Sequence, residues 1–203
     1  MKIAITGTGG VGKTTLANAL AASLKIPVIA ENMQDVVGMI GKLGASQKAN
    51  PPATAEQVKV LQLQYQNTCI AWLNDRAKQQ QETPSFVADR FAIDLLARLI
   101  MPTSQKPSEE LILKVIAECK RQSAMLDLII MPPLIRLATP TAPNESGLKR
   151  HDALSMKLFS HSLNRGLIEQ LLTVPRLYIP VNAKTTEQRV EVVQKAISKL
   201  NIK

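Results

Sequence analysis

Four glycines stand close together, directly behind a short apolar run at the start of the chain. The run is Ile3-Ala4-Ile5, and residues 7–14 read Gly-Thr-Gly-Gly-Val-Gly-Lys-Thr. Such a run is typical of a buried strand, and the residues behind the glycines have the period of an amphipathic helix. A glycine-rich turn between a strand and a helix gathers backbone N–H groups and the positive end of the helix dipole. The segment therefore predicts a turn that binds an anion.

The spacing within this turn is that of a phosphate-binding loop: glycine, four residues, then glycine, lysine and threonine. Lys13 is expected to reach the β- and γ-phosphates of a nucleoside triphosphate, and the Thr14 hydroxyl to ligate Mg²⁺. A mere glycine-rich turn with a surface lysine would not explain the strand before it and the helix after it. The residues expected to bind ATP here are Gly7, Thr8, Gly9, Gly10, Val11, Gly12, Lys13, Thr14 and Thr15.

The size and composition of the chain suit one compact domain. It has 203 residues, of which 45% are hydrophobic, enough for a full α/β core and a small lid. We therefore expect a single domain over residues 1–203. No apolar run approaches the roughly 20 residues that span a bilayer, and Met1-Lys2 leads into the first strand without the layout of a signal peptide. A cytoplasmic protein with no membrane partner is expected.

The net charge of +9 raises the question of nucleic-acid binding. However, the lysines and arginines are scattered, and the longest basic cluster is Lys149-Arg150-His151. Aromatic residues make up only 3% of the chain, too few for a surface on which bases of a single strand would stack. We expect a solvated basic surface with sites for phosphorylated ligands, and no nucleic-acid partner.

Strand patterns alternate with helix patterns along the chain. This order predicts a three-layer α/β sandwich of the P-loop NTPase type, in which helices cover both faces of a five-stranded parallel sheet. The proline-containing stretch between the fourth strand and the next helix predicts a loop, taken as a lid at about 134–152. The expected strands are 2–6, 26–30, 85–88, 128–131 and 176–181. The helices expected after the first, which runs through Leu24, are 34–43, 54–80, 90–100, 108–124, 151–172 and 187–200.

Ligands of such sheets bind beyond the carboxyl ends of the strands, where Asp89 and Arg90 follow the third strand. An apolar run that closes on Asp is typical of the magnesium site of phosphate-loop enzymes, so Asp89 is a metal candidate with Thr14. Arg90 is expected to pair with a phosphate or with an acidic substrate group. The alternative is that Asp89 caps the helix from Arg90.

Two other residues end strands at the same edge of the sheet. Glu31 follows the second strand, where a carboxylate would orient an attacking hydroxyl or accept its proton. The alternative is a solvated Glu31 that caps the next helix. Asn182 follows the fifth strand and is expected to contact the adenine of ATP, a prediction from position alone.

The lid ends in Lys149 and Arg150, which also open a helix. In a phosphotransferase, a lid arginine would neutralise charge on the transferred phosphoryl group and exclude water. Arg150 is therefore a catalytic candidate, and Arg136 and Arg165 are weaker ones. An ordinary surface loop with basic residues is the alternative.

Together, Ile5 to Thr15, Glu31 and Asp89-Arg90 resemble the nucleoside and nucleotide kinase branch of phosphate-loop proteins. The chain is most similar to small AAA-type ATPases related to nicotinamide riboside kinase. The segment Gly147-Leu148-Lys149-Arg150 resembles the lid of that group, although deoxynucleoside kinases carry several closely spaced arginines there. The resemblance implies ATP as donor, Mg²⁺ as cofactor and a small acceptor near Glu31, Asp89 and Arg90. If the acceptor is a base, Tyr65, Trp72 and Phe91 are the candidates to stack on it.

Two functions of different class follow from these features. The first is a kinase that transfers the γ-phosphate of ATP to a nucleoside, nucleotide or similar small molecule. The second is a regulatory ATPase that acts on a protein partner according to its nucleotide state. A homodimer is compatible with either. The loop also resembles that of partitioning ATPases, but those have a lysine where this chain has Thr8.

Overall fold

A computed structural model describes residues 1–49, 52–101, 107–134 and 150–201, which form the predicted sandwich. The sheet has the order β2-β3-β1-β4-β5, and every neighbouring pair is parallel. The phosphate loop therefore leaves the central strand. The strands are β1 (Lys2–Ile5), β2 (Val28–Ile29), β3 (Phe86–Asp89), β4 (Leu128–Met131) and β5 (Arg176–Tyr178).

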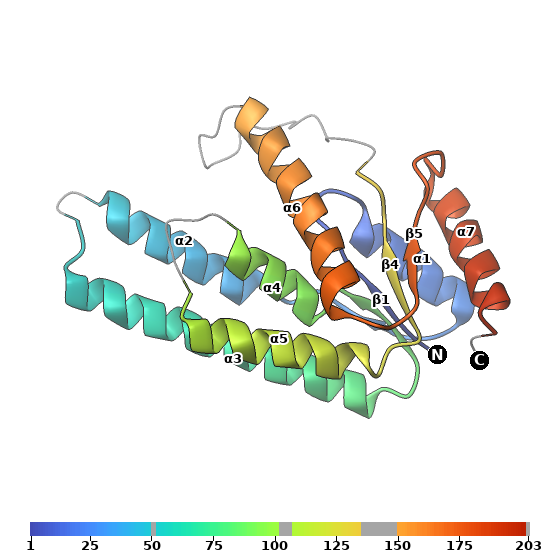
Figure 1. Cartoon of the computed structure of the whole chain (residues 1–203), viewed down its shortest axis with the longest axis horizontal. Coiled ribbons are helices and arrows are strands. Elements are labelled where there is room, and N and C mark those ends of the chain that lie inside the picture. Colours follow the sequence, from blue (N-terminus) through green and yellow to red (C-terminus); the bar gives the residue numbers. More distant parts are fainter. Residues whose placement is uncertain (50–51, 102–106, 135–149, 202–203) are drawn as a thin grey trace.

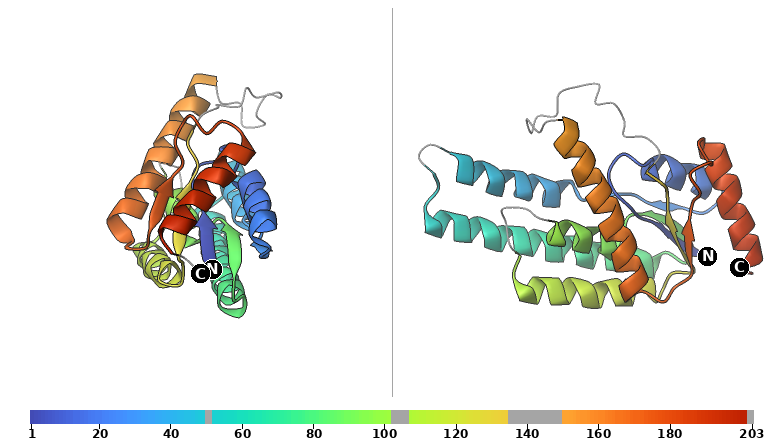
Figure 2. Two further views of the ribbon diagram at one scale, coloured as in Figure 1. Left: turned by 90° about the vertical axis from the view of Figure 1, so that its right-hand side faces the viewer. Right: turned by 45° about the horizontal axis from the view of Figure 1, so that its top comes forward.

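Seven helices lie in the described parts of the chain, each close to its predicted place. Figures 1 and 2 show α1 and α7 on one side of the sheet and the other helices on the opposite side. Helices α2 and α3 lie side by side and extend beyond the sheet (Figure 1). The helices are α1 (Lys13–Leu24), α2 (Gln34–Lys48), α3 (Ala55–Glu82), α4 (Ala92–Ile100), α5 (Glu109–Ser123), α6 (Arg150–Leu171) and α7 (Thr186–Lys199).

Two hydrophobic clusters form the core, one on each face of the sheet. In β1, Ala4 belongs to the cluster under α2 to α6, whereas Ile3 and Ile5 belong to the cluster under α1 and α7. The side chains of β4 alternate in the same way and are all buried. Helices on both faces are the reason why these strands read as continuous apolar runs in the sequence. No helix in the described ranges is long and apolar enough to cross a bilayer.

The predicted ends of several elements were wrong by a few residues. Helix α2 continues to Lys48, and β2 is shorter than predicted. Helix α4 begins at Ala92 rather than at Arg90, because Arg90 has a φ of 74°, which an α-helix does not allow. Most of the predicted lid, residues 135–149, lies outside the described residues.

A fully buried arginine on α3 holds two strand ends together. One nitrogen of the Arg76 guanidinium donates to the carbonyl of Ile29, at 3.2 Å, and the other to those of Ala30 and Asp89, both at 3.0 Å. These carbonyls lie at the carboxyl ends of β2 and β3, where the pairing of the two strands ends. The guanidinium also lies over the ring of Trp72, 5.5 Å from its centre. Arg76 therefore sets the spacing between the segments that carry Glu31 and Asp89.

We predict that Arg76→Ala lowers the free energy of unfolding by at least about 3 kcal/mol, because it removes three hydrogen bonds to carbonyl groups, two of which are buried. Arg121 is the matched control, since it is half-exposed and, among the described residues, pairs only with Glu118 on its own helix. Arg121→Ala should change the free energy by less than about 1 kcal/mol. Urea unfolding followed by circular dichroism measures both. Equal effects of the two substitutions would show that Arg76 does not hold the strands.

Candidate functional site

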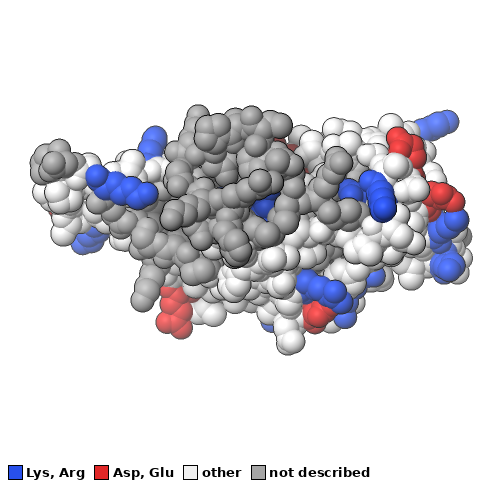
Figure 3. Space-filling model, turned by 90° about the horizontal axis from the view of Figure 1, so that it is seen from above, with Lys and Arg blue, Asp and Glu red and all other residues white. Residues whose placement is uncertain are grey.

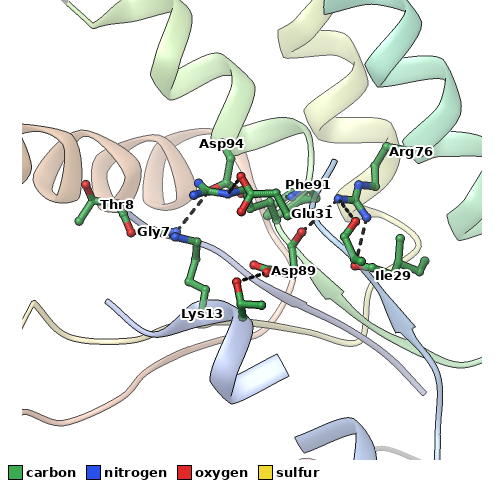
Figure 4. A network of polar contacts seen from close by, with 12 residues as sticks. Gly7, Thr8, Lys13, Ile29, Glu31, Arg76, Asp89, Phe91 and Asp94 are labelled. Carbon is green, nitrogen blue, oxygen red and sulfur yellow. Dashed lines mark hydrogen bonds and ion pairs between the residues drawn. The ribbon is translucent and has the colours of Figure 1, made fainter. Parts of the chain in front are cut away.

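The phosphate loop forms at the carboxyl end of β1, in the middle of the sheet (Figure 4). Its turn depends on Gly10 and Gly12, whose φ angles of 80° and 83° lie in the left-handed region that favours glycine. Gly12 is the N-cap of α1, so the free N–H groups of the first helical turn face the loop. Thr14 and Thr15 are exposed in that turn. The geometry is that of an anion site at a helix N-terminus.

Lys13 is buried beneath the loop, and its ammonium donates to the Thr8 carbonyl at 2.7 Å (Figure 4). Burial, assisted by the nearby charge of Arg90, lowers the Lys13 pKa to about 8. The carboxylates of Asp94, Asp89 and Glu31 oppose this shift without cancelling it. An anion in the loop would supply the missing negative charge and restore a fully charged lysine.

Asp89 ends β3 opposite the first turn of α1. The Thr14 hydroxyl donates to Asp89 Oδ2 at 2.5 Å, while Asp89 Oδ1 is buried and has no hydrogen-bond partner among the described residues. Burial raises the Asp89 pKa, and the bond from Thr14 opposes that shift. An unpartnered carboxylate oxygen beside a hydroxyl is a donor set that suits Mg²⁺. The alternative that Asp89 caps the next helix is wrong, because the N-cap of α4 is Phe91.

Arg90 is placed between two carboxylates. Its Nε forms an ion pair with Glu31 Oε1 at 2.7 Å, and its Nη1 one with Asp94 Oδ1 at 3.3 Å. The left-handed backbone of Arg90 is strained, a feature that concentrates at functional sites. Glu31 does not cap α2, whose N-cap is Met33. The structure thus brings Glu31, Asp89 and Arg90 together beside Lys13, as the sequence predicts.

Asp94 completes this group, although the sequence reasoning did not select it. Its Oδ1 accepts the N–H of Gly7 at 3.4 Å as well as Arg90, and its Oδ2 accepts the N–H of Phe91 at 3.1 Å. One carboxylate therefore connects the phosphate loop, the arginine and the start of α4. The sequence does contain a signal for this capping role, because Asp94 is an acidic residue in the first turn of an apolar helix.

A second connection that the sequence did not reveal comes from α7. Arg189 donates to the carbonyl of Val11 in the loop, at 2.9 Å, and to that of Ala183 after β5, at 3.1 Å. This brings the turn that contains exposed Asn182 next to the phosphate loop. The location agrees with a nucleotide site, and the contact of Asn182 with adenine stays a prediction.

A cavity of about 280 Å³ opens from the phosphate loop and runs between α2, α4 and α6. Its volume is near the lower end of small-molecule sites, which hold about 300–1,000 Å³. The loop and Arg90 line one end, so the cavity adjoins the place expected for a γ-phosphate. Its lining is Gly7, Thr8, Gly9, Ile40, Arg90, Asp94, Ala97, Arg98, Met101, Met156, Lys157, Ser160 and Asn164.

Three aromatic residues expected to stack on a base do not reach this cavity. Tyr65, Trp72 and Phe91 are buried in the hydrophobic core and are not part of the described lining. They fill the space between α3, α4 and the sheet, a packing role that helical spacing alone also predicts.

The expected lid cations are mostly outside the described part of the chain. Arg136 and Lys149 are not described, and Arg150 begins α6 without a described side chain. Its role stays a prediction. Arg165 is exposed and pairs with Glu169 at 2.9 Å, so it does not face the loop. Among the described side chains of α6, Lys157 is the cation that lines the cavity, and the sequence reasoning did not select it.

Comparisons with known proteins agree with this fold. A family model described as an AAA domain matches residues 2–189. Deoxyadenosine kinase from M. mycoides, solved with dCMP and dCDP, has a TM-score of 0.61 and 16% identity, and the match covers 98% of this chain and 100% of the kinase chain. Shikimate kinase from Acinetobacter baumannii, solved with shikimate, has a TM-score of 0.53 and 13% identity, and the match covers 100% of this chain and 95% of the kinase chain. No curated protein shows a significant match. The chain thus has the fold of a P-loop kinase.

We predict that affinity for MgATP falls as the pH rises above 8. The ammonium form of Lys13 binds phosphate, and its pKa of about 8 means that this form is lost above that pH unless binding restores it. Between pH 7 and pH 9 the dissociation constant should rise up to about tenfold, with proton uptake on binding at the higher pH. Titration calorimetry in buffers of different ionisation enthalpy measures both. A constant affinity without proton uptake would contradict the lowered pKa.

Proposed function

The chain belongs to the AAA-domain family, and we propose that it is a kinase that transfers the γ-phosphate of ATP to a small molecule. One observation carries the proposal. The phosphate loop and the group Glu31, Asp89 and Arg90 meet at one end of a cavity large enough for a small acceptor. A nucleotide in the loop would have its terminal phosphate at the mouth of that cavity.

The chain's own residues supply the parts that phosphoryl transfer needs. Lys13 and the N–H groups of the loop and of α1 would bind the phosphates, and Thr14 and Asp89 would hold Mg²⁺. When bound, Mg²⁺ would neutralise charge on the phosphate oxygens. Arg90 is held by Glu31 and Asp94 in the position from which a guanidinium can orient the acceptor or the transferred group.

Glu31 is the better candidate for the base. Asp89 is 1% exposed and engaged by Thr14, whereas the Glu31 side chain is 31% exposed beside Arg90. In the proposed step the acceptor oxygen forms a bond to the γ-phosphorus, and the bond from that phosphorus to the bridging oxygen breaks. ADP leaves with the electron pair, and the proton of an acceptor hydroxyl goes to Glu31.

The solved structures of similar fold support a small acceptor without naming it. One was solved with the products dCMP and dCDP and the other with shikimate, so the fold binds small molecules of different chemistry. ATP as donor also favours the cytoplasm as the place of action, and a homodimer stays a prediction. On the face that Figure 3 shows, the described basic side chains are separated rather than joined in one patch, so this face does not favour nucleic acid as a partner.

We predict that γ-labelled ATP passes its label to at least one member of a panel of nucleosides, nucleoside monophosphates, pyridine nucleosides and hydroxy acids. Lys13→Ala should lose most of this transfer while keeping the thermal midpoint of unfolding, because it removes a phosphate ligand from the loop. Lys25→Ala, at the far end of α1, is the matched control and should keep the activity. Release of label to water alone would favour the regulatory ATPase instead.

We further predict different defects for the two carboxylates. Glu31→Gln should lower kcat about 10²- to 10⁴-fold with little change in the Mg²⁺ requirement, because it removes the base. Asp89→Asn should raise the Mg²⁺ concentration needed for half-maximal rate, because it weakens the metal site. Rate measurements over a Mg²⁺ series, with the best acceptor of the panel, separate the two. Exchanged phenotypes would assign the base to Asp89.

A further inference from the structure

One face of α4 lines the cavity, and it carries a second arginine. Four residues with the spacing of one helical face line the cavity: Asp94, Ala97 and Arg98 of α4, and its C-cap Met101. Asp94 contacts the phosphate loop, so this end of the face lies next to the expected γ-phosphate. Arg98 is one helical turn further along, a rise of about 6 Å. The cavity therefore has a cation at a distance from the expected point of phosphoryl transfer.

Arg98 has no counter-ion in the described parts of the chain. It is half-buried on α4, and no hydrogen bond or ion pair joins it to another described residue. Burial lowers its pKa, and so does the charge of Arg90. Tyr65 is nearby, and burial keeps that phenol neutral by raising its pKa. The nearby carboxylates, Glu31 and Asp94, already pair with Arg90.

An uncompensated, half-buried charge is unfavourable unless a ligand of opposite charge completes it. Lys157 of α6 is a second cation of the lining without an ion pair to a described residue, but its position is different. Its ammonium lies 3.6 Å from where a Cβ of Gly10 would be, next to the phosphate loop. Lys157 is thus in a position to contact the phosphates of a nucleotide. Arg98 is then the cation of the lining that remains to pair with the acceptor.

The rest of the lining near Arg98 is largely apolar. This part of the cavity is surrounded by Ile40 of α2, Ala97 of α4, Met101 directly after α4 and Met156 of α6. A ligand that fits must therefore combine an apolar body with one anionic group. Guanidinium recognises carboxylates and phosphates alike, through paired hydrogen bonds of matching geometry.

We propose that the acceptor is a small organic anion whose carboxylate or phosphomonoester pairs with Arg98, while its accepting oxygen lies beside Arg90 at the phosphate loop. That the bound anion is an acceptor rests on the proposed kinase function. The anion site itself can be tested by binding alone. The ligand class is set by Arg98 and by the apolar side chains around it.

Direct binding tests the proposal with pairs of twin ligands, each of which consists of an anion and an uncharged analogue of that anion. The carboxylate pair is shikimate and its methyl ester, and the phosphomonoester pair is dCMP and deoxycytidine. Titration calorimetry is done with a non-hydrolysable ATP analogue present. In at least one pair the anionic twin should bind at least about tenfold more tightly, and that pair identifies the anion.

Arg98→Gln should remove this preference by weakening the anionic twin alone, and Arg98→Lys should keep part of it. Arg121→Ala, on the surface of α5, should keep it fully. Equal binding of both twins in both pairs, absence of binding by either anion, or an unchanged preference in Arg98→Gln would overturn the proposal. An anion preference without label transfer would instead refute the kinase function and leave the anion site standing.

Discussion

The guanidinium of Arg76 is the contact on which the functional end of the sheet depends. It donates to carbonyls at the carboxyl ends of β2 and β3, where no further strand pairing holds the two segments. Those segments carry Glu31 and Asp89, and Arg90 follows at once. A buried cation is tolerated here because three backbone acceptors and the Trp72 ring surround it. The interaction converts two short strands into a rigid base for the site.

Two charged groups at the loop, Lys13 and Asp89, lack a full set of partners when no ligand is bound. Among the described residues, Lys13 has only a carbonyl as hydrogen-bond partner, and one oxygen of Asp89 has none. Arg90, by contrast, is paired with two carboxylates and held in place. Phosphoryl transfer requires hydrogen-bond donors that are already in position before the anion binds. Within the described parts of the chain, Arg98 is a further unpaired donor of this kind, on the side of the cavity proposed for the acceptor.

Sequence reasoning succeeded where a signal was local. The loop over residues 7–14, the alternation of strands and helices, and the acidic residues that end strands all follow from spacing and composition. It missed Arg76, Asp94, Arg98 and Arg189, whose partners lie on other elements or in a cavity. It also offered buried aromatics as ligands, because periodicity does not distinguish a core face from a binding face.

The sequence alone determined that a phosphate-binding loop stands between a strand and a helix of an α/β sandwich, because glycine spacing and apolar runs act over short distances. It also placed Glu31, Asp89 and Arg90 at strand ends. Only the tertiary structure decided that β3 pairs with β1 and β2, so that these residues converge on the loop. It alone decided which cations keep a partner and which face a cavity, because charge compensation depends on elements that are distant in the chain.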